Sequence, residues 1–114
     1  MVLSKGDLVL VEFPFTDPNQ AKLRPALVLA VAAKLDEVTL CFVSSQSVGA
    51  LEANEFALNA GDLEFAQTGL RVSSKVRVTR ITTLNSQLVG IRLGKLGTQH
   101  TQVLNECLLQ AFRL

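Results

Sequence analysis

The sequence offers few residues that could act together as acid, base and nucleophile in a recognised catalytic motif. The single histidine, His100, has no second His and no Cys or Ser partner at motif spacing, so the histidine pair of many nucleases is absent. We expect it to be an exposed residue in the first turn of a C-terminal helix. Cys41 and Cys107 fall in apolar patterns, which predicts buried core thiols. No zinc-ligand or phosphate-binding glycine motif is present, so we expect no metal and no cofactor.

The remaining candidates lie where predicted strands begin or end. Arg24 stands directly before Pro25 and a run of apolar residues, at a loop-to-strand junction. Ser44 and Ser45 end a neighbouring predicted strand, so their hydroxyl groups can reach the same rim as Arg24. A guanidinium and two hydroxyls can hold a phosphate. A salt bridge between Arg24 and Asp17, or another acid, is equally compatible with the spacing.

Charge is divided unevenly along the chain, although the net charge is only +1. Residues 1–70 contain four Lys or Arg against nine Asp or Glu, and residues 71–114 contain seven against one. Most of these cations form one basic segment: Arg71, Lys75, Arg77, Arg80, Arg92 and Lys95. Such a segment fits a polyanionic partner, and it fits equally a solvated strand face that acids elsewhere balance.

Length and composition indicate one domain over residues 1–114. A chain of 114 residues, 48% of them hydrophobic, can bury a core without disulfide or metal cross-links. The first residues contain a charged Lys5-Gly6-Asp7 step that interrupts any signal-peptide pattern. The longest apolar run, residues 25–33, is too short to span a bilayer. We therefore expect a cytoplasmic protein without a membrane segment.

Hydrophobic alternation predicts a mainly β fold with helices. The expected strands cover residues 7–15, 25–33, 38–44, 55–58, 71–84 and 88–93, with a helical turn within 61–67. The run at 25–33 is apolar on both faces, as in a central strand. After Gly97 the apolar spacing is helical and Thr98 is a plausible N-cap. Many short strands without a βαβ rhythm favour a small antiparallel barrel with a C-terminal α-helix packed on it.

One strand carries an irregularity in its pattern. Within residues 71–84, Val76 and Val78 point inward, while Lys75, Arg77 and Thr79 point outward. The alternation then reverses at Arg80, which predicts a β-bulge or a strand end there.

Three runs of residues resemble a known family in both order and spacing. They are GDLVLV at 6–11, FPFTD at 13–17 and KLRPALVL at 22–29. The resemblance continues through residues 44–46, 69–70, 74–77, 83–84 and 91–96. In these runs the sequence is similar to the PemK/MazF-like toxins of type II toxin–antitoxin systems. The resemblance implies an SH3-like barrel, a homodimer and a cognate antitoxin. It also implies metal-independent cleavage of single-stranded RNA to 2′,3′-cyclic phosphate and 5′-hydroxyl ends.

The resemblance assigns site residues by position. Its catalytic positions are Arg24, Ser44, where Thr is common in the family, and Arg77. Some members have a carboxylate two residues after the second Arg, and this chain has Thr79 there. The expected RNA-binding positions are Phe15, Asn19, Gln20, Lys22, Ser45, Gln46, Lys75 and Thr79. Gln20 is retained from the first loop of better-known members, and Asn19 replaces a Glu.

Two other functions remain open at this point. One is a toxin on the same barrel that poisons a topoisomerase by binding alone, against which the pair Arg24 and Ser44 argues. The other is a non-catalytic SH3-like adaptor, for which Thr79 in place of a carboxylate is the main argument. The target RNA class, the cleavage sequence and the group that moves the proton are not fixed by the sequence.

Overall fold

The computed structural model describes residues 1–13 and 22–114, and its strands form one antiparallel sheet in the order β4-β5-β3-β2-β1-β6. The strands are β1 (Asp7–Phe13), β2 (Lys22–Ala32), β3 (Glu37–Ser44), β4 (Glu55–Leu58), β5 (Ser74–Asn85) and β6 (Val89–Lys95). Short 3₁₀ turns are η1 (Ala33–Leu35), η2 (Ala66–Thr68) and η3 (Ser86–Leu88), and the chain continues into helix α1 (Thr98–Phe112). The mainly β fold with a C-terminal helix is therefore confirmed.

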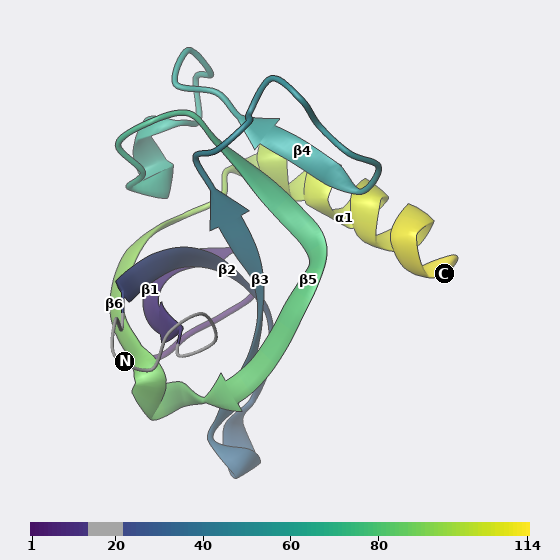
Figure 1. Ribbon diagram of the computed structural model, residues 1–114. Coiled ribbons are helices and arrows are strands. Elements are labelled where there is room, and N and C mark those ends of the chain that lie inside the picture. The colour runs from purple at the N-terminus through teal and green to yellow at the C-terminus, as the bar shows by residue number, and fades with distance from the viewer. Residues whose placement is uncertain (14–21) are drawn as a thin grey trace.

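The sheet curls strongly but its pairing does not close into a ring (Figure 1). Strands β4 and β6 are its edges, and no ladder joins them among the described residues. The segment around η2 packs directly on β6 instead. A Cβ atom on Gly69 would overlap the carbonyl of Leu93, and one on Gly94 would overlap the carbonyl of Gln67. This close contact covers the open side of the sheet where the predicted barrel would have closed.

Two clusters of buried side chains lie on opposite faces of the curled sheet. Strand β2 contributes to both, because Leu27 packs with Leu104 of α1 while Ala26 and Val28 pack in the other cluster with Val9. All of these side chains are fully buried. The prediction of a central strand covered on both faces is confirmed for this part of β2.

The predicted irregularity in β5 is a bulge. In the pairing with β3, Phe42 faces Arg77 while the preceding Cys41 faces Ile81, so three residues of β5 have no partner in the ladder. Val76 and Val78 are buried, as predicted. In a regular strand the side chains of residues 77 and 80 would lie on opposite faces. The bulge brings them to the same side.

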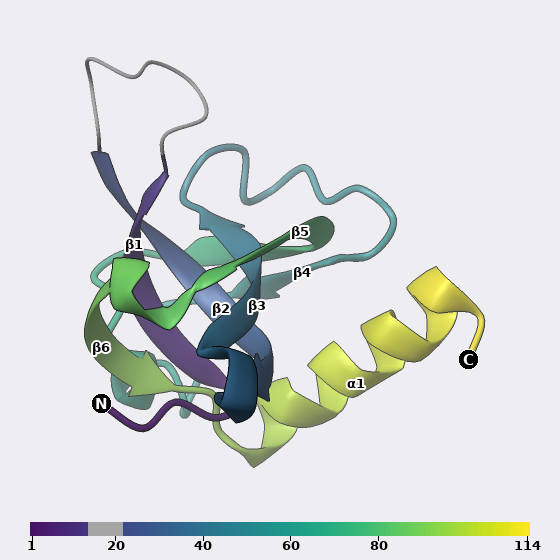
Figure 2. The same ribbon diagram turned by 90° about the horizontal axis from the view of Figure 1, so that it is seen from below.

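Helix α1 begins one residue earlier than the sequence predicts. Gly97, not Thr98, is the N-cap, and the carboxylate of Glu64 accepts the backbone N–H groups of Gln99 and His100, each at 3.1 Å. A side chain remote in sequence thus replaces the local cap. The C-terminal end of α1 projects away from the sheet (Figure 2). In the part of the chain that the structure describes, no helix combines the length and apolar character needed to cross a membrane.

Candidate functional site

A groove of about 590 Å³ lies where β2, β3 and β5 meet the loop before β5. It brings together the three predicted catalytic residues Arg24, Ser44 and Arg77, which come from three different strands. The predicted RNA-binding residues that also line it are Lys22, Ser45 and Gln46. The sheet thus brings Arg24 and Arg77, which are 53 positions apart in the sequence, to one surface.

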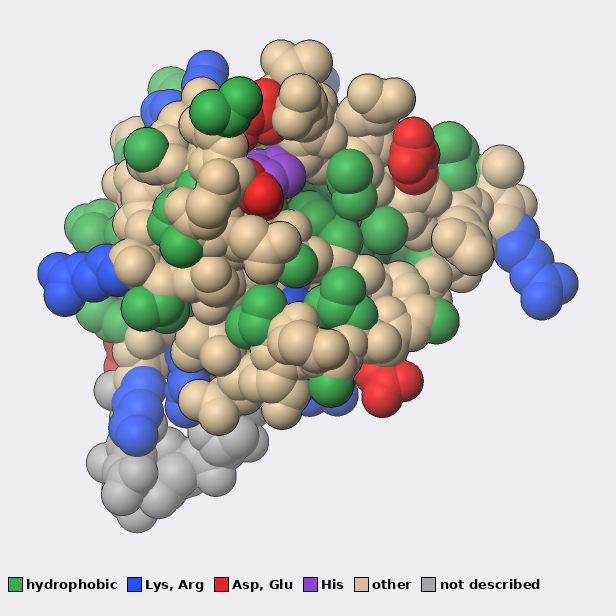
Figure 3. All heavy atoms as spheres, turned by 90° about the horizontal axis from the view of Figure 1, so that it is seen from above, with side chains coloured by type: hydrophobic (Ala, Val, Ile, Leu, Met, Phe, Trp, Pro, Cys, Tyr) green, Lys and Arg blue, Asp and Glu red, His purple; other side chains and the backbone are tan. Residues whose placement is uncertain are grey.

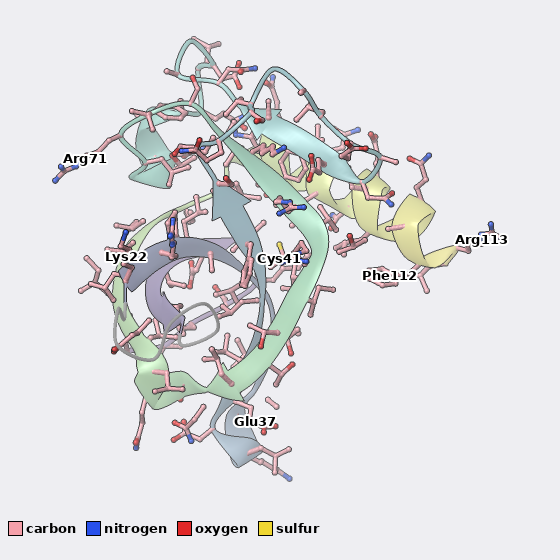
Figure 4. All side chains as sticks on the ribbon, in the orientation of Figure 1. Lys22, Glu37, Cys41, Arg71, Phe112 and Arg113 are labelled. Carbon is pink, nitrogen blue, oxygen red and sulfur yellow. The ribbon has the colours of Figure 1, made fainter. Side chains whose placement is uncertain are left out.

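The lining of the groove is strongly basic. Its cations are Lys22, Arg24, Arg71, Arg77 and Arg80, and none of its described lining residues is Asp or Glu. Lys22 lies at the start of β2 and Arg71 in the loop before β5 (Figure 4). On the face shown in Figure 3, Lys and Arg side chains gather at the left and lower left of the molecule. A surface of this kind attracts a polyanion.

Arg24 reaches the groove from the exposed part of β2, where it faces Val11 of β1 in the ladder. Among residues 1–13 and 22–114 its side chain has no hydrogen bond and no ion pair. Asp17, the acid that the sequence offered as its salt-bridge partner, lies outside the described residues. The described part of the chain therefore leaves the guanidinium available to an anion.

Ser44 ends β3, and its side chain is oriented by a local turn. The backbone N–H of Gln46 donates to Ser44 Oγ at 3.1 Å. This bond uses the oxygen as an acceptor and leaves the hydroxyl hydrogen free to donate. Ser44 therefore presents a donor to any phosphate that Arg24 binds.

Arg77 differs from Arg24 because its guanidinium is held by an acid behind the groove. Its Nε donates to Glu55 Oε2 at 2.9 Å, and the side chain of Arg77 remains 38% exposed. Arg80 is the last of the three unpaired residues of the bulge and lies over the ring of Phe42, 5.8 Å from its centroid, in cation–π contact. Arg71, Arg80 and Glu55 were not among the predicted site residues. Only the basic segment at 71–95 gave a signal for the first two.

The family model of the PemK-like, MazF-like toxins of type II toxin–antitoxin systems matches residues 4–112. The chain belongs to this family. The three runs of residues in the first half of this toxin all lie within the matched range. A comparison with curated proteins gives no match.

Solved structures with the same fold cover almost the whole toxin. An endoribonuclease in complex with its cognate antitoxin, from Mycobacterial species, has a TM-score of 0.74 at 16% identity over 99% of this chain and 97% of that chain. MazF from Deinococcus radiodurans has a TM-score of 0.73 at 24% identity over 100% and 99%. The toxin MazF-mt6 of Mycobacterium tuberculosis has a TM-score of 0.70 at 22% identity over 95% and 97%. At these identities the likeness shows a shared fold.

Several residues that we expected in the toxin's site lie elsewhere. Lys75 is buried rather than outward-facing, because Glu55 pairs with its Nζ at 3.1 Å and the carbonyl of Ala50 accepts from it at 3.4 Å. The alternation of apolar and polar residues predicted which face of β5 carries Lys75. It did not predict the segment with Ala50 and Glu55 that covers this face. Thr79 is exposed and does not line the groove. The remaining predicted positions, Phe15, Asn19 and Gln20, lie outside the described residues.

The prediction that His100 is exposed is wrong. It is 8% exposed, and its Nε2 lies 3.1 Å from Asp62 Oδ2. The hydrogen bond with His100 lowers the pKa of Asp62, and the backbone N–H groups of Gln99 and His100 lower the pKa of Glu64. The hydrogen bonds of Asp62 and Glu64 thus join the loop before η2 to the start of α1. We call Asp62, Glu64 and His100 the helix-start cluster.

The cysteines match their predicted structural role in part. Cys41 is fully buried, and that burial raises the pKa of its thiol to about 12. Cys107, a residue of α1, is half-buried and packs against the core, and its pKa is raised first by burial and then by Glu106. Within the described residues, no three His, Cys, Asp or Glu side chains are grouped as metal ligands.

Proposed function

We propose that this toxin is an endoribonuclease that cleaves single-stranded RNA without a metal ion and leaves 2′,3′-cyclic phosphate and 5′-hydroxyl ends. The observation that carries the proposal is the groove itself. Arg24, Ser44 and Arg77 all line it, and the two arginines are among its five cations. Among the proteins with the same fold are an endoribonuclease from Mycobacterial species and the toxin MazF-mt6 of Mycobacterium tuberculosis.

RNA supplies the nucleophile for this reaction, because the 2′-hydroxyl of one ribose lies next to the phosphate that it attacks. A bond forms between O2′ and phosphorus, and the bond from phosphorus to O5′ breaks. The 2′ proton is released to water in the open groove, and the leaving 5′-oxygen takes a proton from water. The protein then has to align the phosphate and neutralise the added negative charge.

The groove residues divide these tasks according to their chemistry. Arg24 stabilises the charge on the phosphorane with a guanidinium that the described residues leave unpaired. Ser44 donates its hydroxyl hydrogen to a non-bridging oxygen. Arg77 provides the second guanidinium, while Lys22, Arg71 and Arg80 contact flanking phosphates. In this proposal the cations of the groove do the electrostatic work that a metal ion does in other nucleases.

We propose two protein partners for the same domain, which spans residues 1–114. The first is a second copy of the chain, and the second is a cognate antitoxin. The relative from Mycobacterial species was solved with its cognate antitoxin, and a MazE–MazF structure from Deinococcus radiodurans has a TM-score of 0.71 with this chain. Light scattering at micromolar concentration should give a dimer mass, and a monomer would contradict the first partner.

Product ends provide the decisive test of the function. The purified toxin, in buffer with EDTA, is incubated with a mixed-sequence single-stranded RNA, with the same RNA carrying 2′-O-methyl groups, and with DNA of the same sequence. We expect cleavage of the unmodified RNA alone, with cyclic phosphate at the 3′ side of each cut. Cleavage that stops with EDTA and returns with Mg²⁺, or cleavage of the 2′-O-methyl RNA, would refute the mechanism. Growth inhibition without any cleavage would instead favour a toxin that acts by binding.

A further inference from the structure

Glu55 is a nearly buried acid directly behind the basic groove. It lies on β4, faces Arg77 of β5 in the ladder, and its side chain is 6% exposed. Its two carboxylate oxygens have different partners, since Oε2 accepts from Arg77 Nε at 2.9 Å and Oε1 lies 3.1 Å from Lys75 Nζ. A carboxylate thus contacts the second arginine of the groove, although residue 79 of this chain is a threonine.

This carboxylate is ionised at neutral pH. Burial alone would raise the pKa of Glu55, but hydrogen bonds from the backbone N–H of Glu52 and from the side chains of Lys75 and Arg77 outweigh it and lower the pKa. Glu55 does not line the groove and so does not reach a bound phosphate. It therefore acts as a fixed negative charge and not as a proton acceptor.

The two cations bound to Glu55 are not equivalent. Lys75 is buried, makes a further contact with the carbonyl of Ala50, and does not line the groove. Arg77 lines the groove and uses only its Nε toward Glu55. Within residues 1–13 and 22–114, both Nη groups of Arg77 are without a hydrogen-bond partner. Because the guanidinium is planar, a bond at Nε fixes the plane in which the Nη donors lie.

We propose that Glu55 is the positioning residue for Arg77, holding the guanidinium through Nε so that its Nη groups face the phosphate in the groove. The inference rests on the proposed ribonuclease function and adds a residue on β4 to that site. Lys75 balances the remaining charge of the carboxylate, so Arg77 keeps its attraction for RNA although it is paired. Glu55 acts through Arg77, and its loss changes the alignment of the transition state more than the binding of RNA.

Steady-state cleavage of a short RNA by Glu55→Ala, which removes the acceptor for Arg77 Nε, tests this role. We expect kcat to fall about ten- to a hundredfold with KM nearly unchanged. The matched control is Glu52→Ala, which makes the same truncation at an exposed side chain nearby and should cleave like the wild type. In the Arg77→Ala background, Glu55→Ala should cause no further loss, because the two residues act as one unit. Multiplicative losses in the double variant would overturn the proposal.

Loss of Glu55 leaves Lys75 buried without its anion, and this can unfold the protein. The double variant Glu55→Ala/Lys75→Met removes both buried charges and leaves Arg77 in place. If it is folded by circular dichroism, its kcat should still be about ten- to a hundredfold below that of the wild type. A folded double variant with wild-type kcat would overturn the proposal.

Nitrogen-15 NMR provides a readout that requires no RNA. The Nε–H resonance of Arg77, assigned by its loss in Arg77→Lys, should exchange slowly with water in the wild type and rapidly in Glu55→Ala. Rapid exchange in the wild type would overturn the proposed contact. A wild-type protein that cuts no RNA refutes the ribonuclease function and this role with it. If the wild type cuts RNA and Arg77→Ala or Glu55→Ala cuts it equally well, only the inference fails.

Discussion

The basic groove and the helix-start cluster use charged side chains in opposite ways. In the helix-start cluster, Glu64 accepts two backbone N–H groups at the start of α1 and Asp62 lies 3.1 Å from His100 Nε2. In the groove, Arg24 has no side-chain partner among the described residues, and the described lining contains no acid. One region has its charges satisfied internally, and the other presents them to a partner.

This contrast separates stability from function within one small fold. A cluster whose acids accept hydrogen bonds from within the fold stabilises the native state and needs no ligand. Several like charges on one surface repel one another and are compensated when an anion binds. Arg77 combines both conditions, since Glu55 fixes its Nε while its Nη groups remain without partners in the described residues. Substitutions in the two regions should therefore have separable effects.

Arg24→Ala should give the largest effect on cleavage. Removal of a preorganised donor at the developing charge typically costs about 10²–10³ in kcat, and we expect a loss of at least this size with Tm unchanged. The matched control is Arg92→Ala, because Arg92 Nε pairs with Asp7 at 3.4 Å and does not line the groove. That variant should cleave normally. A fall in the Tm of Arg24→Ala would show that Arg24 is a structural residue and would break the comparison.

Ser44→Ala should have a smaller effect on the same reaction. It removes one neutral hydrogen-bond donor, worth about 0.5–1.5 kcal/mol, which corresponds to roughly a tenfold loss in kcat at most. Ser44→Thr keeps the hydroxyl and should retain most of the activity. Single-turnover cleavage with saturating protein measures both. A loss in Ser44→Ala as large as that in Arg24→Ala would contradict the assignment of charge stabilisation to the arginine.

The sequence predicted the fold well where the pattern is local. Strand β4 was predicted with its observed ends, and the parity reversal at Arg80 correctly indicated the bulge in β5. The start of α1 was misassigned because its cap is Glu64, more than 30 residues away, and no local pattern encodes such a contact. The predicted antiparallel barrel is present as a curled sheet that does not close, because η2 and not another strand packs against β6.

The placement of the candidate residues follows the same division between local pattern and remote contact. Arg24, Ser44 and Arg77 were expected to share one surface, and all three line the groove. Their roles in cleavage remain predictions. Lys75 was placed outward because alternation reports the face of a strand and not what packs over that face. Glu55 was missed because its partner is set by the pairing of β4 with β5, which the sequence does not specify.

Arg80→Ala should weaken RNA binding with little effect on kcat. Arg80 lies over Phe42 beside the three proposed catalytic residues, so we expect it to contact a flanking phosphate. Loss of one such contact reduces the slope of log affinity against log salt by about 0.7 for a single strand. Binding of a 2′-O-methyl RNA measured over a range of salt concentrations gives this slope. Lys34→Ala removes an exposed cation outside the groove and should leave the slope unchanged.

Glu64→Gln should have the smallest effect on cleavage, namely none at neutral pH, and should change how stability depends on acid. The pKa values of Asp62 and Glu64 are lowered from 3.8 and 4.5 in the native state, so the unfolded chain binds more protons. Both ionised carboxylates contribute fully to stability when the pH is above their ordinary pKa values. That contribution is lost as the pH falls through their lowered pKa values in the native state. The Tm of the wild type should therefore rise between about pH 3 and pH 5, and the rise should be smaller in Glu64→Gln. The amide still accepts a backbone N–H, so α1 keeps a cap above this range. If the folded variant instead cut RNA more slowly at pH 7, the helix-start cluster would be coupled to the groove, and the separation of the two regions would fail.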